Sequence, residues 1–405
     1  MTGFDPERLR RIDEWMESYV TRGRFPGSTF VLAKGGEVVH RATVGWRAVE
    51  AKKPFQEDTI VRIFSMTKPV TSVALMMLAE KGLFHLDAPL SEFLPEFADA
   101  RALVAGAERL DQTEPCAPPT LHQLLTHTSG LTYSFNPGPV AAAYKDGKLD
   151  FNADGPGLEA AAKRVAEPPL AFAPGARWEY SVGIDVIGRV VEVVAGKTLD
   201  VFFEEEILGP LGMTDTFFSV PDDKVDRFAN LYTSLEGDPM GLGQKAVDGV
   251  MRETDVAESS PYRGVTTLSG GGGLLSTADD YLRFAEMLRK GGACEDGRLL
   301  SPSTLRFMKR NHLQSDIASM GPQSFAEMPM TGMGFGIGGA VVIDPARCRM
   351  AGNVGDFSWG GIASTVFWVD EVADLSCVFL TQLTPSSSYP NRAQLKALVH
   401  AAATS

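Results

Sequence analysis

The stretch TIVRIFSMTKPVTSVALMMLAEKG, residues 59–82, decides how we expect this chain to fold. Its first six residues are rich in β-branched and aromatic side chains, which favours a strand. The run 65–82 that follows is largely apolar and ends at Gly82, which is typical of one buried helix. Pro69 is compatible with that helix because the amides of a first turn have no intrahelical partner. Ser65 is therefore expected at a strand-to-helix junction.

The flanking sequence predicts regular elements toward both ends of the chain. Apolar residues recur every three or four positions over 5–22, which predicts a helix, and two β-prone runs flank a Gly-Gly pair over 28–46, which predicts a hairpin. Ser276 followed by Asp279 has the pattern of a capping box, so a helix is expected to begin there. Further strands are expected at 335–343, 364–369 and 375–381, and further helices at 121–125, 184–196 and 391–403.

The middle of the chain has another character. Short helical patterns, separated by long connections rich in proline, glycine and aspartate, run from about residue 85 to about 264. We therefore expect an α/β (α+β) domain built from residues 1–84 and 265–405, with a mostly helical domain inserted at 85–264. A cleft between the two is the expected place for a ligand site.

Composition and charge restrict the class of protein. Of the 405 residues, 44% are apolar and 22% are charged, as in an ordinary globular protein. The net charge of −13, without a run of basic residues, argues against nucleic acid and anionic membranes as partners. The longest apolar stretch, 73–79, is far shorter than the roughly 20 residues of a spanning helix, and the N-terminus lacks the apolar region of a signal peptide. We therefore expect a cytoplasmic protein, and the sequence leaves its oligomeric state open.

Residue spacing disfavours several kinds of site. The six histidines form no metal-ligand pattern, so no metal is expected, and the four cysteines lack a C-x-x-C pair and are expected to be reduced thiols. The run 270–273 lacks the Gly-Lys-Ser/Thr ending of a phosphate-binding loop, which favours a flexible connection. His127 and Ser129 are two positions apart and no third partner is identifiable, so we interpret 127–130 as a structural turn.

The tetrad Ser65-Met66-Thr67-Lys68 is the most informative chemical motif. Residues three apart on a helix share one face, so the Ser65 hydroxyl and the Lys68 amine are expected within hydrogen-bond range. The positive potential of the helix N-terminus and a partly buried site both disfavour the ammonium, which favours a free amine able to accept the Ser65 proton. Tyr180, in PGARWEYS, is a candidate proton acceptor or relay beside this pair. Each motif alone also fits a structural role: a capping serine with a surface lysine, and an aromatic residue packed after a turn.

Matching segments spread over nearly the whole chain resemble the serine β-lactamase and penicillin-binding superfamily, and more closely its class C β-lactamase-like esterases, the family VIII carboxylesterases. The segments are PGSTFVLAKGGEVV (26–39), FSMTK (64–68), LLTHTSGLTY (124–133), FAPGARWEYS (172–181), GGGLLSTADDY (271–281), GFGIGG (334–339) and SWGGIASTVFWVD (358–370). The resemblance implies a β-lactamase/transpeptidase-like fold, with an antiparallel sheet flanked by helices and a mostly helical domain beside it. It implies no cofactor.

Position by position, the resemblance also implies roles for a small set of residues. Ser65 would be the acylated nucleophile, and Lys68 and Tyr180 would form the acid–base pair. The backbone N–H groups of Ser65 and Ile362 would bind the oxyanion. The triplet Trp359-Gly360-Gly361 would line the cleft on a strand, at the place where the lactamases carry Lys-Thr-Gly.

Two departures from the lactamase pattern bear on the substrate. Val182 stands where the lactamases have an asparagine, and Trp359 stands where they have a lysine, so both polar handles for β-lactams or D-Ala-D-Ala peptides are missing. An apolar wall suits neutral esters instead. We therefore expect a serine carboxylesterase that takes small, short-acyl esters as its small-molecule partner. The alternatives are a β-lactamase or D,D-peptidase, an acyltransferase that uses the same Ser-Lys-Tyr site, and a catalytically silent binding protein of the same fold.

Overall fold

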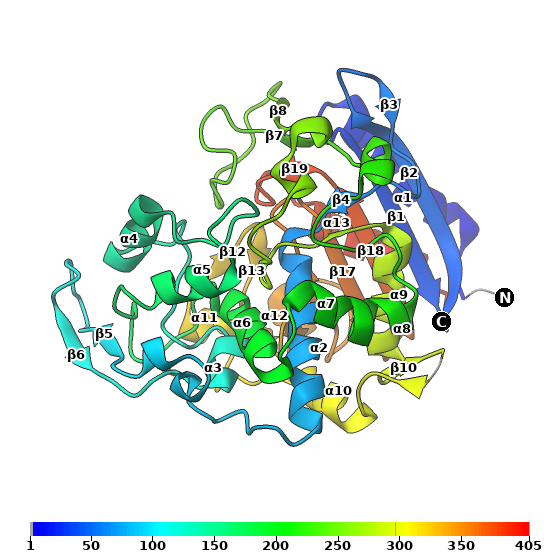
Figure 1. Ribbon diagram of the computed structural model, residues 1–405. Coiled ribbons are helices and arrows are strands. Elements are labelled where there is room, and N and C mark those ends of the chain that lie inside the picture. Colours follow the sequence, from blue (N-terminus) through cyan, green and yellow to red (C-terminus); the bar gives the residue numbers. More distant parts are fainter. Residues whose placement is uncertain (1–2, 296, 405) are drawn as a thin grey trace.

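The computed structural model describes residues 3–295 and 297–404, and an eight-stranded sheet lies at its centre. The order of the strands is β14-β15-β16-β17-β18-β1-β2-β3, and all neighbouring pairs are antiparallel. The strands are β1 (Gly27–Lys34), β2 (Glu37–Ala48), β3 (Lys53–Pro54), β14 (Met333–Phe335), β15 (Ala340–Val342), β16 (Phe357–Gly360), β17 (Val366–Asp370) and β18 (Leu375–Thr381). The N-terminal hairpin thus lies beside the C-terminal strands (Figure 1), which confirms the expected fold class.

Helices cover both faces of this sheet. They are α1 (Pro6–Thr21) and α13 (Asn391–Ala402) on one face, and α2 (Thr67–Glu80) and α9 (Ala278–Arg289) on the other. Alternate residues of a strand point to opposite faces. Accordingly, Phe30 and Leu32 of β1 pack into the core under α1 and α13, whereas Val31 and Ala33 belong to the core that contains α2. The central strands are therefore apolar on both faces.

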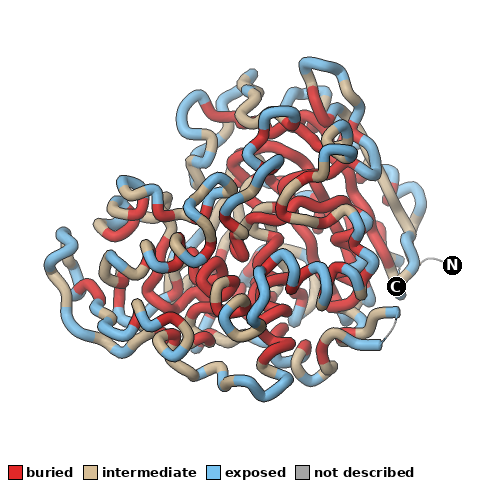
Figure 2. Tube along the Cα trace, in the orientation of Figure 1, coloured by how far each residue is buried: buried red, intermediate tan, exposed pale blue. Residues whose placement is uncertain are grey.

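The middle of the chain has mainly helices as its regular elements and packs against α2 (Figure 1), and its residues Asp226 and Asn230 contact Arg47 of β2. Its helices are α3 (Leu121–Leu125), α4 (Pro139–Gly147), α5 (Leu158–Val165), α6 (Gly183–Ala195), α7 (Leu199–Phe203) and α8 (Gly209–Leu211). The two helices α2 and α6 pack against each other, and every α2 residue from Thr67 to Leu78 is buried. Figure 2 shows this buried interior continuing from the sheet into the helical part. The domain boundaries at 84/85 and 264/265 remain predictions.

Shorter elements complete the fold. The small sheets are β4–β9 (Val61–Arg62, Leu275–Ser276), β5–β6 (Arg101–Leu103, Thr113–Pro115), β7–β8–β19 (Leu231–Thr233, Arg252–Asp255, Leu383–Thr384), β10–β11 (Ala293–Cys294, Gly297–Arg298) and β12–β13 (Ser324–Phe325, Met328–Pro329). The remaining α-helices are α10 (Pro302–Met308), α11 (Ile317–Met320) and α12 (Pro345–Cys348). Across residues 3–295 and 297–404, no helix combines the length and apolarity needed to cross a membrane. The four cysteines are free thiols.

Two expected elements differ from the structure. The cap of α9 is Thr277 rather than Ser276: the Thr277 side chain accepts the Asp280 amide, while Ser276 belongs to β9 and its hydroxyl bonds to Thr216. The single strand expected at 335–343 is the hairpin β14–β15. Its turn contains Gly338 in the left-handed region (φ +84°), a conformation that glycine adopts without steric cost.

Candidate active site

Ser65 lies on a tight turn between β4 and α2. The turn is the 3-10 segment Phe64–Met66, and Phe64 has a φ of +45°. A bulky residue in this left-handed region is strained and persists only when the surrounding structure holds it. Two hydrogen bonds do so here, because the Ile63 amide donates to Leu274 O (3.2 Å) and the Tyr281 hydroxyl donates to Met66 O (2.7 Å). The turn presents Ser65 to a cavity.

Lys68 lies one helical turn after Ser65 and is fully buried. Its Nζ donates to Ser65 Oγ at 3.2 Å, to the Tyr133 hydroxyl at 2.9 Å and to Gly271 O at 2.7 Å. An ammonium group has three N–H donors and no acceptor. These three acceptors therefore match its full donor capacity.

Tyr180 meets Lys68 through the face of its ring, with Lys68 Nζ 4.6 Å from the ring centroid. The Tyr180 hydroxyl accepts a hydrogen bond from Trp359 Nε1 at 3.3 Å. The structure thus brings Ser65, Lys68 and Tyr180 together, and their catalytic roles stay predictions. It also places Trp359 behind Tyr180 as a hydrogen-bond donor, a role that the sequence did not suggest.

His127 supports the Tyr180 segment from behind. It is fully buried with a φ of +56°, and its Nδ1 lies 3.1 Å from Ser181 Oγ and accepts the Ser181 amide at 3.3 Å. The His127 ring lies 4.7 Å from the Tyr180 ring, centroid to centroid. Burial, together with the nearby Lys68 charge, holds the pKa of His127 well below its usual value. A neutral imidazole in this position fits the structural turn that we inferred from the sequence.

Two polar side chains that the sequence analysis did not single out, Tyr133 and Asp185, complete the surroundings of Lys68. Asp185 is 1% exposed and accepts hydrogen bonds from Ser269 Oγ (2.5 Å), the Gly271 amide (2.9 Å) and the Tyr133 hydroxyl (3.3 Å). Burial raises the pKa of Asp185, although Lys68 and these hydrogen bonds oppose the rise. Burial also raises the pKa of Tyr133 well above its usual value.

The sequence contains features from which Tyr133 and Asp185 could have been identified. Tyr133 is the last residue of the matching segment 124–133, and Asp185 is the single acidic residue in the apolar run 184–191. A carboxylate on a fully buried helix face is uncommon and requires polar partners. That signal identifies Asp185 as a residue with a specific partner, but it does not say which one.

The glycine run 270–273 is not the flexible connection that we expected. Gly270, Gly271 and Gly273 are buried, and an added Cβ on Gly271 would lie 2.2 Å from Asp185 Oδ2. An added Cβ on Gly270 would lie 2.9 Å from Ile184 O. The glycines therefore allow this segment to approach α6 closely, which brings the Gly271 amide to Asp185 and the Gly271 carbonyl to Lys68.

A cavity of about 400 Å³ opens in front of Ser65. Gly360, Gly361 and Ile362 line it, whereas Val182 is fully buried at the start of α6. The substrate and oxyanion contacts expected of these residues stay predictions. Trp359 is 7% exposed and borders a second, smaller cavity of about 70 Å³. The apolar wall of the large cavity includes Phe64, Phe135, Phe151, Leu231, Leu242 and Phe325.

The arginines on the cavity wall are ion-paired. Arg62 lies 2.7 Å from Asp255, and Arg392 lies 3.2 Å from Glu327, a carboxylate with 6% of its side chain exposed. Arg392 also donates to the backbone carbonyl of Gly361 at 2.8 Å. Both guanidinium groups are therefore neutralised within the protein.

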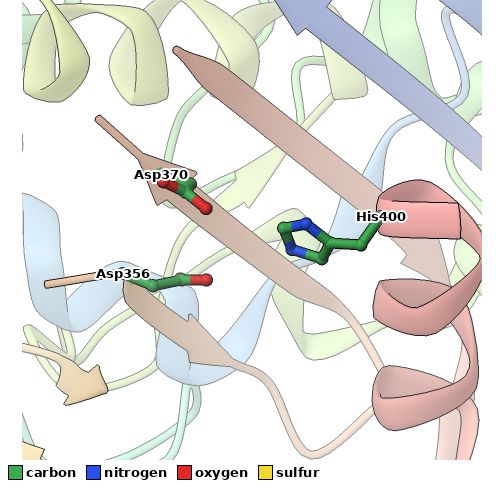
Figure 3. Close-up of side chains that lie close together, drawn as sticks. All are labelled: Asp356, Asp370 and His400. Atoms are coloured by element: carbon green, nitrogen blue, oxygen red, sulfur yellow. The ribbon is translucent and has the colours of Figure 1, made fainter. Parts of the chain in front are cut away.

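A second cluster of polar side chains lies between the sheet and α13. Asp356, Asp370 and His400 each place a potential ligand atom within 4.8 Å of the others (Figure 3). Lys396, one helical turn before His400 on α13, brings its Nζ to 2.5 Å from Asp356 Oδ2. The lysine supplies the positive charge that two neighbouring buried carboxylates require. We interpret the cluster as structural, with the Lys396–Asp356 ion pair joining α13 to the residue before β16.

Comparisons with known proteins agree with this geometry. The model of the family described as Beta-lactamase matches residues 12–401. The Mycobacterium tuberculosis protein Rv1367c is 37% identical over 90% of this chain and 88% of its own length, and esterase EstB of Burkholderia gladioli is 33% identical over 92% and 89%. The solved structure of EstCE1, described as a hydrolase with promiscuous acyltransferase activity, superposes with a TM-score of 0.78 at 29% identity and covers 98% of both chains.

These matches span almost the entire chain, and they confirm the resemblance drawn from the sequence segments. A serine, a buried lysine and a tyrosine meet at an apolar cavity, and such a set of side chains suits nucleophilic catalysis by the serine. The chain therefore belongs to the beta-lactamase family and is a serine hydrolase, an enzyme of ester hydrolysis or acyl transfer.

Proposed function

We propose that this protein is a carboxylesterase that hydrolyses small, uncharged, short-acyl esters through an acyl-enzyme on Ser65. The observation that carries the proposal is the contact of 3.2 Å between Lys68 Nζ and Ser65 Oγ at the edge of a largely apolar cavity. The cavity volume of about 400 Å³ lies toward the small end of the range of roughly 300–1,000 Å³ in which small-molecule sites fall. That volume favours a small ester.

In the proposed mechanism, Ser65 Oγ attacks the ester carbonyl while the Lys68/Tyr180 pair takes the hydroxyl proton. The carbon–oxygen bond to the alcohol then breaks, and the pair returns the proton to the leaving alkoxide. Water attacks the acyl-enzyme by the same steps in reverse order and releases the acid. Ser65 and Ile362 both line the cavity, and the mechanism assigns their backbone amides as donors to the oxyanion.

The charges around the cavity favour an uncharged substrate. Trp359 offers no positive charge, and its indole N–H is already used by Tyr180. The wall arginines, Arg62 and Arg392, are paired with Asp255 and Glu327. The cavity lining carries three basic residues, Arg62, Lys145 and Arg392, and five aspartates, Asp150, Asp154, Asp185, Asp238 and Asp255. A substrate carboxylate, such as that of a penicillin, would therefore meet an excess of acidic groups.

Acyl transfer is the second candidate function. The similarity to EstCE1, whose description includes promiscuous acyltransferase activity, favours it, because only the nucleophile of the second step differs from hydrolysis. An alcohol bound in the apolar cavity would attack the acyl-enzyme in place of water. The charges on the cavity wall do not favour the β-lactamase alternative, because a β-lactam carries a carboxylate.

The first experiment measures hydrolysis of p-nitrophenyl esters from acetyl to dodecanoyl, with nitrocefin assayed beside them. We expect acetyl and butyryl esters to be the best substrates and nitrocefin to be cleaved slowly or not at all. The variant Ser65→Ala is expected to lose ester turnover and labelling by a fluorophosphonate probe. Efficient nitrocefin cleavage, or undiminished ester turnover in Ser65→Ala, would refute the proposal.

A second experiment separates hydrolysis from acyl transfer. The enzyme is given p-nitrophenyl butyrate with increasing concentrations of a primary alcohol, and butyrate and butyryl ester are measured together with p-nitrophenol. For a hydrolase we expect butyric acid to remain the main product. If the alkyl ester becomes the main product at millimolar alcohol, acyl transfer takes first place.

A further inference from the structure

We propose that Asp185 accepts, through the Tyr133 hydroxyl, the proton that Lys68 must lose before it can take one from Ser65. The inference rests on the proposed function and deepens it, because it assigns a source for the free amine that the mechanism uses. Asp185 lines the same cavity as Ser65, but its hydrogen-bond path to Lys68 runs through the Tyr133 hydroxyl, so it acts as a positioning residue.

The starting point is the hydrogen-bond saturation of Lys68. As an ammonium, its three N–H groups are directed to Ser65 Oγ, the Tyr133 hydroxyl and Gly271 O, at 3.2, 2.9 and 2.7 Å. A saturated ammonium has no lone pair and cannot accept a proton. It must first become an amine, and full burial of Lys68 removes direct exchange with water as a fast route.

The Tyr133 hydroxyl offers another route. It accepts from Lys68 Nζ and donates to Asp185 Oδ2 at 3.3 Å. In the proposed step, a Lys68 N–H bond breaks as a new O–H bond forms on Tyr133, and the original Tyr133 O–H bond breaks as an O–H bond forms on Asp185 Oδ2. Tyr133 ends with one hydrogen, as it began. Rotation about the Lys68 Cε–Nζ bond then turns the new lone pair toward Ser65.

The surroundings of Asp185 suit an acceptor of this kind. Its Oδ1 receives both the Ser269 hydroxyl and the Gly271 amide, which fixes the carboxyl group, whereas Oδ2 faces Tyr133. Burial raises the pKa of the Asp185 carboxyl, so its protonated form is less costly than that of an exposed aspartate. In this buried site the charged pair, Asp185 carboxylate with Lys68 ammonium, is therefore less favoured over the neutral pair than it would be in water.

The relay has a consequence for pH dependence. The resting pair, carboxylate with ammonium, and the reactive pair, carboxylic acid with amine, hold the same number of protons. The rate of Ser65 attack is therefore expected to be flat across the neutral range. Without Asp185 or without the Tyr133 hydroxyl, the proton must leave the site for solvent, so the rate is expected to rise with pH. Asp150, Tyr180 and His127 also face Lys68 or Tyr133, and they are unchanged in these variants.

The test compares wild type, Asp185→Asn and Tyr133→Phe between pH 5.5 and 9. The readouts are kcat/KM for p-nitrophenyl butyrate and the rate of fluorophosphonate labelling of Ser65. The control is Asp280→Asn, since Asp280 is also a buried carboxylate, but its hydrogen bonds come from the Asp215 amide and the Thr216 hydroxyl. Circular dichroism and thermal unfolding establish that each variant is folded, and Tyr133→Phe removes a single oxygen should Asp185→Asn fail to fold.

For both relay variants we expect a loss of about 10²–10⁴-fold at pH 7, the range for loss of a general base, with recovery as the pH rises. The control should keep the flat profile. A profile parallel to wild type, lowered equally at every pH, would assign Asp185 a merely structural role and overturn the proposal. Faster reaction at low pH would do the same, because it would mean that Asp185 only stabilises the ammonium.

Failure of the relay and failure of the proposed function are distinguishable. If wild type labels rapidly with the fluorophosphonate but hydrolyses no ester, the substrate proposal fails, and the labelling profiles still test the relay. If esters are hydrolysed and the pH profiles of the variants match that of wild type, the relay alone fails.

Discussion

The change Gly361→Ala tests whether the two proposed oxyanion amides work as a pair. Gly361 precedes Ile362, and an added Cβ would lie 2.4 Å from Ile63 O and 2.5 Å from Thr365 Oγ1. Real Cβ atoms essentially never approach closer than 3.0 Å, so the backbone must move by at least 0.6 Å (3.0 − 2.4). Ile63 lies two residues before Ser65, so this movement separates the Ile362 amide from the Ser65 amide.

A displacement of this size has a large expected effect on rate. A misplacement of about 1 Å can cost about 10²-fold, and loss of one oxyanion donor costs about 10²–10³-fold in kcat. We therefore expect kcat for p-nitrophenyl butyrate to fall about 10²-fold, with KM changed only a few-fold. Overpacking should lower the free energy of unfolding by about 1–3 kcal/mol.

The assay combines steady-state hydrolysis with urea unfolding of the same preparation. The matched control is Gly264→Ala, because an added Cβ at Gly264 meets nothing within 4 Å. We expect this control to keep wild-type kcat and stability. A folded Gly361→Ala enzyme with kcat within threefold of wild type would refute the reasoning about the Ile362 amide.

Two further predictions concern the groups behind Tyr180. Trp359→Phe keeps an aromatic ring but removes the indole N–H that donates to the Tyr180 hydroxyl. Because one hydrogen bond is worth about 0.5–1.5 kcal/mol, we expect kcat to fall about two- to twelvefold at unchanged KM. An unchanged kcat would show that this hydrogen bond has no role in catalysis. His127 has a depressed pKa, so it stays neutral in the folded state while the unfolded chain binds a proton below pH 6.5, and its contribution to stability is lost as the pH falls. Urea unfolding should show that His127→Gln loses less stability than wild type between pH 7.5 and 5.5. The expected difference is about 1.4 kcal/mol over this range, nearly all of it below pH 6.5, and equal pH dependence in the two proteins would contradict this.

Several features of the fold follow from short-range sequence patterns. Apolar patterns predicted α1, α2, α6 and α13 to within a few residues of their observed ends. Runs of β-prone residues predicted the hairpin β1–β2 and strands β17 and β18. The errors were also local: Ser276 and Thr277 are neighbouring candidates for one cap, and their difference depends on the backbone conformation that β9 imposes. Likewise, the turn within 335–343 depends on the left-handed conformation of Gly338.

In the candidate site, too, some contacts could be predicted from local sequence and others could not. The proximity of Ser65 and Lys68 was predictable, because a separation of three residues on a helix brings side chains together whatever the rest of the chain does. The pairing of Lys68 with Tyr133 spans 65 residues, and its bond to Gly271 O spans 203. No local pattern encodes such contacts.

Local patterns were thus enough to predict several of the helices and strands, the Ser65–Lys68 pair and, through the matching segments, the family. The contact of Asp185 with Tyr133, the packing of the glycine run on α6 and the bond from the Trp359 indole to Tyr180 depend on the tertiary structure. The physical reason is that local backbone geometry governs neighbours within one or two turns. Polar groups that are distant in the sequence come into contact because a buried donor or acceptor without a hydrogen-bond partner is energetically costly.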